Sequence, residues 1–294
     1  MSILTKKLND GNEIPIVGYG IGTANSRQEC SAQIVSALNT GYRYIDTAEM
    51  YKNCSSVKDA LAEWGGKRED VFILTKWGLV DLSGDNDPRE TLLKLLEQMG
   101  LDYVDLYLIH TPLHATVNGR TQSECWKMME DLKKEGLARS IGVSNYREED
   151  FLAFETTWEF PPAVNQLEYH PYNAHPANMI RMKTICDKHE ILIMAYGSLA
   201  PLTRATGPPL ENVIEGMAKE TGMTTGQVLL KWSEQYSGGI SVTTSTKVQR
   251  QKEQLEAFTI WPPLSDDQVD RIAQVGKERY FRHFGKSIWD KAAP

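Results

Sequence analysis

The sequence predicts an α/β protein of the (β/α)8 TIM-barrel class, with an N-terminal β-hairpin cap and an extra C-terminal helix and tail. Eight short runs rich in β-branched and aromatic residues recur along the chain, each followed by a segment with helical spacing of apolar residues. The runs are continuously apolar, as expected for parallel strands covered on both faces. No linker, composition shift or internal repeat divides residues 1–294, so we expect one domain; the alternative is an open, doubly wound sheet.

The expected elements follow in chain order. The strands are expected at residues 14–22, 42–48, 71–77, 104–110, 138–144, 163–168, 191–197 and 239–245. The helices are expected at residues 27–39, 55–64, 88–99, 123–134, 176–189, 211–220, 225–235 and 248–258, several of them opened by Ser, Asp or Pro.

The two ends of the chain lie outside this alternation. Residues 4–14 contain an Asn-Asp-Gly-Asn turn between two extended runs, which predicts a hairpin that plugs one mouth of the barrel. Another helix is expected to start at Ser265. The aromatic tail at residues 280–284 shows no clear secondary structure and is expected to cover the opposite mouth.

Composition and charge exclude several classes of protein. The chain carries 32 Lys and Arg against 39 Asp and Glu, a net charge of −7, and shows no dense basic stripe, which argues against a nucleic-acid partner. No apolar stretch has the length of a signal sequence or a membrane span. The four cysteines lie far apart, as expected for reduced thiols rather than a metal site. We expect a cytoplasmic monomer without a bound metal.

Polar residues end the predicted strands at one mouth of the barrel, where the active sites of such barrels lie. Asp46 ends the second strand and Tyr51 follows shortly after it. Lys76 and His110 end the third and fourth strands. A carboxylate, a phenol, an amine and an imidazole are therefore expected close together.

This set of side chains suits the donation of a proton to an oxygen that gains negative charge. The unperturbed pKa of a phenol is about 10, and an ammonium beside it, such as that of Lys76, favours the phenolate and lowers that pKa. Asp46 would keep Lys76 protonated away from water, and a neutral His110 would hold a substrate oxygen through its ring N–H. Taken singly, these residues are as readily interpreted as a helix cap, an ion pair and packing residues, but their coincidence at one mouth favours catalysis.

The motifs around these residues resemble those of the aldo-keto reductase family. The segment Gly41-Tyr-Arg-Tyr-Ile-Asp46-Thr-Ala-Glu-Met-Tyr51-Lys-Asn resembles its aspartate and tyrosine signature. Leu74-Thr-Lys76 and Asp105-Leu-Tyr-Leu-Ile-His110 resemble its lysine and histidine signatures. Ile141-Gly-Val-Ser-Asn145 and Asn165-Gln-Leu-Glu168 resemble its cofactor face. The similarity runs from about residue 4 to about residue 258 in the family's order.

The resemblance implies a barrel that binds an extended nicotinamide dinucleotide and passes a hydride to an aldehyde or ketone carbon. Tyr51 would be the general acid, Lys76 and Asp46 would tune it, and His110 would orient the carbonyl. The residues implied to contact the nicotinamide and the pyrophosphate are Gly22, Thr23, Ser144, Asn145, Gln166, Tyr196, Gly197, Ser198 and Leu199. Of these, Ser144, Asn145 and Gln166 would bond the carboxamide, Tyr196 would stack on the ring, and the turn at residues 197–199 would take the pyrophosphate through backbone N–H groups.

The glycines at positions 18, 20 and 22 lack the third spacing of a Rossmann fingerprint. We expect these glycines, at the end of the first strand, to make room for the nicotinamide ring.

The adenosine end departs from the family's pattern. Where relatives that prefer the phosphorylated cofactor carry Pro-Lys-Ser, this chain reads Thr-Thr-Ser at residues 243–245. The residues implied there are Thr244, Ser245, Thr246, Lys247, Arg250, Glu253 and Gln254, the last in place of the usual asparagine. Because two cations remain within one loop and helix start, we expect NADPH rather than NADH.

The substrate rim also departs from the family's pattern. Ala24 and Thr111 stand where bulky tryptophans are common, and Cys54 replaces a glutamate, so we expect a wider or less aromatic pocket with Trp77 as an alternative wall. The Thr-Thr-Ser pattern is similar to that of fungal reductases acting on ketopantoyl lactone and conjugated cyclic diketones.

The sequence therefore predicts an NADPH-dependent reductase of small or medium aldehydes or ketones. Two alternatives stay open. One is a cofactor-binding regulatory subunit with slow turnover. The other is a non-redox barrel isomerase or lyase that uses Asp46, Lys76 and His110 without a nucleotide.

Overall fold

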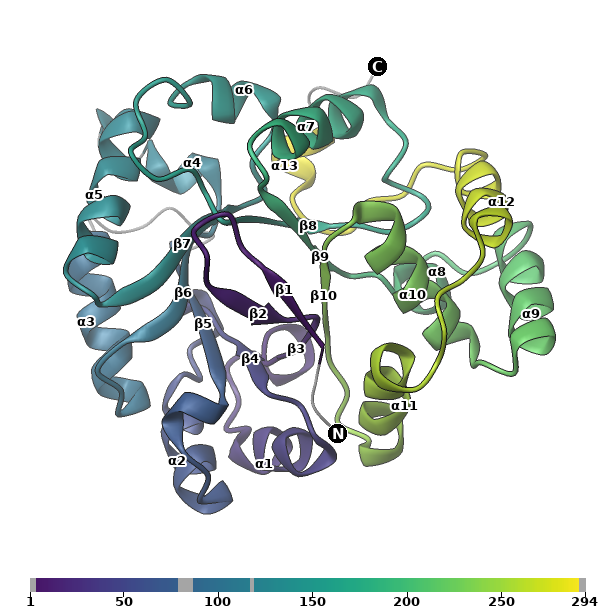
Figure 1. Ribbon diagram of the computed structural model, residues 1–294, viewed down its shortest axis with the longest axis horizontal. Coiled ribbons are helices and arrows are strands. Elements are labelled where there is room, and N and C mark those ends of the chain that lie inside the picture. The colour runs from purple at the N-terminus through teal and green to yellow at the C-terminus, as the bar shows by residue number, and fades with distance from the viewer. Residues whose placement is uncertain (1–3, 79–86, 117–118, 291–294) are drawn as a thin grey trace.

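The computed structural model describes residues 4–78, 87–116 and 119–290. Eight strands, each parallel to both of its neighbours, close into a barrel in the order β10-β3-β4-β5-β6-β7-β8-β9 (Figure 1). The strands are β3 Val17–Gly20, β4 Tyr44–Asp46, β5 Phe72–Trp77, β6 Val104–Ile109, β7 Ala138–Ser144, β8 Val164–Glu168, β9 Leu192–Tyr196 and β10 Ile240–Thr243. The closed barrel confirms the predicted fold class and excludes the open sheet.

Helices surround the barrel, as Figure 1 shows. They are α1 Ser31–Thr40, α2 Ser55–Trp64, α3 Pro88–Met99, α4 Pro112–Ala115, α5 Gln122–Lys134, α6 Glu148–Leu152, α7 Ala177–Lys188, α8 Ala200–Thr203, α9 Leu210–Thr221, α10 Thr225–Ser237, α11 Val248–Thr259, α12 Asp266–Gly276 and α13 Lys286–Trp289. In the described ranges, none of them has the length and apolar character needed to cross a bilayer.

Local signals placed the long helices well. Helix α3 has the predicted bounds because the Asp87 side chain accepts hydrogen bonds from the backbone N–H groups of Arg89 and Glu90, and Pro88 occupies the first helical position. Helices α4, α6, α8 and α13 were not predicted. Each has only four or five residues, too few for a helical period to show in the sequence.

The N-terminal hairpin covers the amino-terminal mouth of the barrel, as predicted. Strands β1 Thr5–Lys7 and β2 Glu13–Pro15 pair antiparallel. The side-chain amide of Asn9 donates to the carbonyls of Pro162 and His189, which precede β8 and β9, and the hairpin lies across the barrel in Figure 1. The expected first barrel strand at residues 14–22 was therefore too long. Its start belongs to the hairpin, and the barrel strand begins at Val17, after a bend at Ile16.

The C-terminal tail reaches the opposite mouth, also as predicted. The backbone N–H groups of His283 and Phe284 donate to the carboxylate of Glu168, at the carboxyl end of β8. The chain then continues into the short helix α13. Hairpin and tail therefore lie at the two opposite mouths of the barrel.

The barrel interior is filled by side chains, including a fully buried tyrosine that depends on a glycine. The ring of Tyr44 lies against Gly18, where an added Cβ would lie 2.4 Å from two ring carbons. A larger residue at position 18 would displace this ring. The glycine at position 18 therefore makes room for a ring of the chain itself, and the expectation that the strand-end glycines make room for the nicotinamide ring stays a prediction.

Candidate active site

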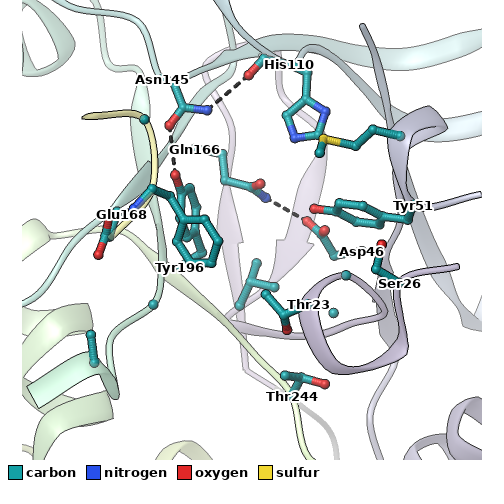
Figure 2. Close-up of a pocket in the computed structure, with 18 of the residues that line it drawn as sticks. Thr23, Ser26, Asp46, Tyr51, His110, Asn145, Gln166, Glu168, Tyr196 and Thr244 are labelled. Atoms are coloured by element: carbon teal, nitrogen blue, oxygen red, sulfur yellow. Dashed lines mark hydrogen bonds between the residues drawn. The ribbon is translucent and has the colours of Figure 1, made fainter. Parts of the chain in front are cut away.

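A cavity of about 690 Å³ opens at the carboxyl ends of the strands. Asp46, Tyr51 and His110 line one end, and Asn145, Gln166 and Tyr196 line the middle (Figure 2). Gly197, Ser198, Leu199 and Thr244 line the remainder, together with Gly22 and Thr23. The cavity thus joins the predicted catalytic residues to most of the residues expected to contact the nicotinamide and the pyrophosphate.

The four predicted catalytic side chains lie together. The Lys76 ammonium is 2.5 Å from Asp46 Oδ1, donates to the carbonyl of Thr47 at 2.8 Å, and lies 3.4 Å from the Tyr51 hydroxyl. The rings of Tyr51 and His110 meet edge to face with centroids 5.9 Å apart. Gly22 is required here because a Cβ at this position would lie 2.8 Å from the Tyr51 ring.

Burial dominates the electrostatics of this cluster. It raises the pKa of the Tyr51 phenol well above its ordinary value, and the Asp46 carboxylate adds to that rise. The sequence-based expectation of a lowered Tyr51 pKa is therefore wrong for this structure. The reason is that removal of the phenolate from water outweighs the nearby ammonium. Burial also lowers the pKa of Lys76, and Asp46 opposes that shift.

His110 is held as a neutral imidazole. Burial lowers its pKa well below the usual range, and the Lys76 charge adds to the shift. A neutral ring keeps one N–H for donation to an oxygen in the cavity. This agrees with the state that its predicted role requires.

The residues of the cofactor face form one hydrogen-bonded group. Asn145 donates to the His110 carbonyl and to the Ser144 hydroxyl, each at 3.0 Å, and accepts from the Tyr196 hydroxyl at 2.8 Å. The Gln166 amide donates to Asp46 Oδ2 at 2.6 Å, as Figure 2 shows. The predicted carboxamide contacts are therefore connected directly to the carboxylate of Asp46.

Three buried polar atoms of the cavity lining suit a polar ligand. His110 Nδ1, Ser198 Oγ and Thr244 Oγ1 have no hydrogen-bond partner among the described residues, and neither has Gln254 Oε1, which lies outside the lining. Buried polar atoms are almost always paired in folded proteins, so these atoms are available to a ligand. The described chain contains no group of three or more His, Cys, Asp or Glu side chains that could hold a metal ion. A nicotinamide dinucleotide fits this set of donors and acceptors.

The other residues predicted for the adenosine end lie outside the cavity lining. Ser245, Thr246 and Lys247 form the loop after β10, and Arg250, Glu253 and Gln254 lie on α11. Lys247 and Arg250 are exposed, and neither forms an ion pair within the described ranges. The Ser245 hydroxyl accepts from the Lys247 backbone N–H at 3.1 Å and so shapes the start of the helix.

Only one of the three predicted substrate contacts lines the cavity. Thr111 does so, whereas Ala24 is exposed beside it. Trp77 is fully buried and packs edge to face on His114, with ring centroids 4.6 Å apart, so it does not form the expected wall. The reason is that its side chain turns toward α4 rather than into the mouth.

Several residues that line the cavity were not predicted from the sequence. Met50 and Leu113 border it near the catalytic end, and Arg204, Phe284 and Ile288 border it from the loop after β9 and from the tail. The Phe284 ring packs against the Tyr196 ring, with centroids 5.7 Å apart. The Arg204 guanidinium lies over the Phe284 ring, 5.5 Å from its centroid. The only sequence signal for the tail was its aromatic composition.

A closed parallel barrel with these four side chains at the carboxyl-end cavity has the architecture of a barrel enzyme. Residues 16–277 match the sequence model of the Aldo/keto reductase family. The chain belongs to the aldo/keto reductase family, whose members use nicotinamide cofactors.

Similar proteins include two yeast enzymes and one insect structure. The chain is 35% identical over 288 residues to the NAD/NADP-dependent indole-3-acetaldehyde reductase of Schizosaccharomyces pombe, covering 95% of this chain and 97% of that protein. It is 34% identical to the NADPH-dependent alpha-keto amide reductase of Saccharomyces cerevisiae, covering 92% and 90%. The crystal structure of a Bombyx mori aldo-keto reductase in complex with NADP superposes with a TM-score of 0.82 at 29% identity, covering 100% of this chain and 98% of that one.

Proposed function

We propose that this protein reduces an aldehyde or ketone to an alcohol, with NADPH as the hydride source and Tyr51 as the proton donor. The observation that carries the proposal is the Tyr51 hydroxyl, which lies 3.4 Å from the buried Lys76 ammonium at one end of the cavity. Two relatives are named for the reduction of an aldehyde and of a keto amide, which supports a carbonyl substrate.

Each of the four clustered side chains has a separate role in the proposed proton transfer. A reduced nicotinamide held beside Asn145, Gln166 and Tyr196 would supply the hydride for the carbonyl carbon. The neutral His110 ring donates a hydrogen bond to the carbonyl oxygen and orients it. Tyr51, which burial keeps protonated, gives its proton to that oxygen as negative charge develops on it. The Lys76 ammonium, paired with Asp46, then stabilises the phenolate left on Tyr51.

The preference for NADPH rests on the start of α11. Lys247 and Arg250 present two cations beside the first turn of that helix, where backbone N–H groups also favour an anion. A 2′-phosphate would meet both cations and the Ser245 hydroxyl. One relative is named NADPH-dependent and another NAD/NADP-dependent, so the relatives' names do not favour one cofactor. The proposed preference for NADPH therefore rests on Lys247, Arg250 and Ser245 of this chain.

We further propose a single-domain, monomeric, cytoplasmic enzyme for small or medium carbonyl substrates, without a nucleic-acid partner. One closed barrel accounts for the described core, and the four cysteines are buried free thiols. The small side chain of Thr111 in the lining supports room for a substrate with more than one carbonyl, such as the diketones that the Thr-Thr-Ser pattern indicates.

The test follows NADPH absorbance with a panel of activated ketones, and NADPH binding by protein fluorescence. Tyr51→Phe should still bind NADPH and should lose turnover by about 10²–10⁴-fold, the usual contribution of a general acid. Unchanged turnover would rule out Tyr51 as the donor. A wild-type protein that binds NADPH but turns over slowly would favour the regulatory subunit, and one without a fluorescence change would favour the isomerase or lyase.

A further inference from the structure

A fifth polar side chain reaches the catalytic cluster from inside the barrel. Tyr44 lies on β4 two residues before Asp46, so both side chains point to the same face of the strand. The Tyr44 hydroxyl lies 3.2 Å from Asp46 Oδ2 and 3.1 Å from Met194 Sδ. Its side chain is fully buried.

This hydroxyl is a permanent hydrogen-bond donor. Burial, and then the Asp46 charge, raise the pKa of Tyr44 well above its ordinary value, so the phenol keeps its proton. A carboxylate is a far stronger acceptor than a thioether sulfur. The Tyr44 proton is therefore directed to Asp46 rather than to Met194.

The two oxygens of Asp46 have separate partners. Oδ1 accepts from the Lys76 ammonium at 2.5 Å. Oδ2 accepts from Tyr44 and from the Gln166 amide. Because Gln166 also lies on the cofactor face, it can exchange partners when a ligand binds, whereas Tyr44 is enclosed by the barrel and cannot.

The Tyr44 ring has little freedom to move. Gly18 on β3 leaves the space that the ring fills, and the Phe72 ring packs edge to face on it with centroids 5.2 Å apart. The hydroxyl is consequently fixed relative to β4 and β5, the strands that carry Asp46 and Lys76.

We propose that Tyr44 is a positioning residue for the proton transfer: its hydroxyl holds Asp46 Oδ2, so that Oδ1 stays on Lys76 and Lys76 stays charged beside Tyr51. The inference rests on the proposed function for its kinetic consequence, but the geometry it describes does not. The titratable groups that face Lys76 are Asp46, Tyr51, Cys54 and His110, and Asp46 alone of these supplies a counter-charge.

The kinetic test is Tyr44→Phe, which removes one hydroxyl and keeps the ring. We expect kcat to fall about tenfold, the scale of a hydrogen bond to a charged group, with the KM values for NADPH and ketone within about twofold of wild type. The alkaline limb of the kcat profile should move to lower pH, since a looser Asp46 stabilises the Lys76 charge less.

Tyr107→Phe is the matched control. Tyr107 is another fully buried tyrosine on a barrel strand, and its hydroxyl donates to the Pro88 carbonyl at 3.0 Å, away from the cluster. It should lose similar thermal stability and keep the wild-type kcat and pH profile. Equal kinetics in the two variants would overturn the proposal, because a merely structural hydroxyl would behave in the same way.

A readout independent of turnover separates this inference from the proposed function. The Nζ resonance of Lys76 in lysine-labelled protein, assigned with Lys76→Met, reports its titration directly. We expect the Lys76 titration to move to lower pH in Tyr44→Phe but not in Tyr107→Phe. An unchanged titration would overturn the role of Tyr44 even in an active reductase, and a shifted one would support it even if Tyr51→Phe disproved the reductase mechanism.

Discussion

The buried ion pair between Lys76 and Asp46 affects the protonation of the side chains around it. An isolated buried ammonium is strongly disfavoured, so Lys76 depends on Asp46 to remain charged. The same Lys76 charge adds to the burial that keeps His110 neutral. Tyr51 stays protonated because burial disfavours its phenolate. The surroundings of these side chains thus suit the proposed roles of acid, hydrogen-bond donor and stabilising cation.

At the adenosine end, Arg250 is one of the two cations expected to favour NADPH over NADH. Arg250→Ala should raise the KM for NADPH about tenfold or more and leave that for NADH within about twofold, because a guanidinium forms charge-assisted bonds with a phosphate. Steady-state kinetics with both cofactors measure this effect. Lys252→Ala, an exposed cation on the same helix, serves as the control. Equal losses with both cofactors in Arg250→Ala would remove the proposed phosphate contact.

At the scale of elements, the end of β8 holds the tail over the cavity. Burial would raise the pKa of Glu168, but hydrogen bonds from His170 and from the tail backbone lower it overall, so the carboxylate is ionised. It accepts from the backbone of His283 and Phe284, the latter at 2.7 Å. Phe284 in turn borders the cavity beside Tyr196. One side chain therefore connects a barrel strand to the outer wall of the site.

Weakening this connection should loosen the tail without unfolding the barrel. Glu168→Gln loses charge-assisted bonds to the tail, so trypsin should cut at Arg279 or Arg282 about tenfold faster than in the wild type. Glu130→Gln is the control, because Glu130 is also buried and accepts two successive backbone N–H groups, those of Glu159 and Phe160. Equal cleavage rates in both variants would show that Glu168 does not hold the tail.

At the scale of the whole molecule, the two ends of the chain lie at opposite mouths of the barrel. The hairpin covers the amino-terminal mouth, and the tail borders the cavity at the other mouth. The strands of one parallel barrel all bring their carboxyl ends to that second mouth. A single cavity can therefore collect side chains from β4, β8, β9 and β10, which lie far apart in the sequence.

Two buried histidines should make the stability of the whole molecule depend on pH. Burial lowers the pKa of both His110 and His170 below the ordinary value of 6.5, so below that pH the unfolded chain binds protons more readily than the folded protein does. Stability is then highest above pH 6.5 and is lost as the pH falls, by at most about 1 kcal/mol for each histidine between pH 7 and pH 5.5. Urea unfolding at these two pH values should show a smaller loss in His110→Asn. The same loss in both proteins would contradict the assignment.

The sequence by itself determined the barrel class, the order of its strands and the meeting of Asp46, Tyr51, Lys76 and His110 at one mouth. Strand patterns, helix caps such as Asp87 and rim positions such as Asp46 are local features, readable without knowing the partner of any residue. Only the tertiary structure decided that Tyr44 and Gln166 share one oxygen of Asp46, that Trp77 turns to His114, and that the Tyr51 pKa rises. These outcomes depend on burial and on contacts between strands distant in sequence, which no local pattern encodes.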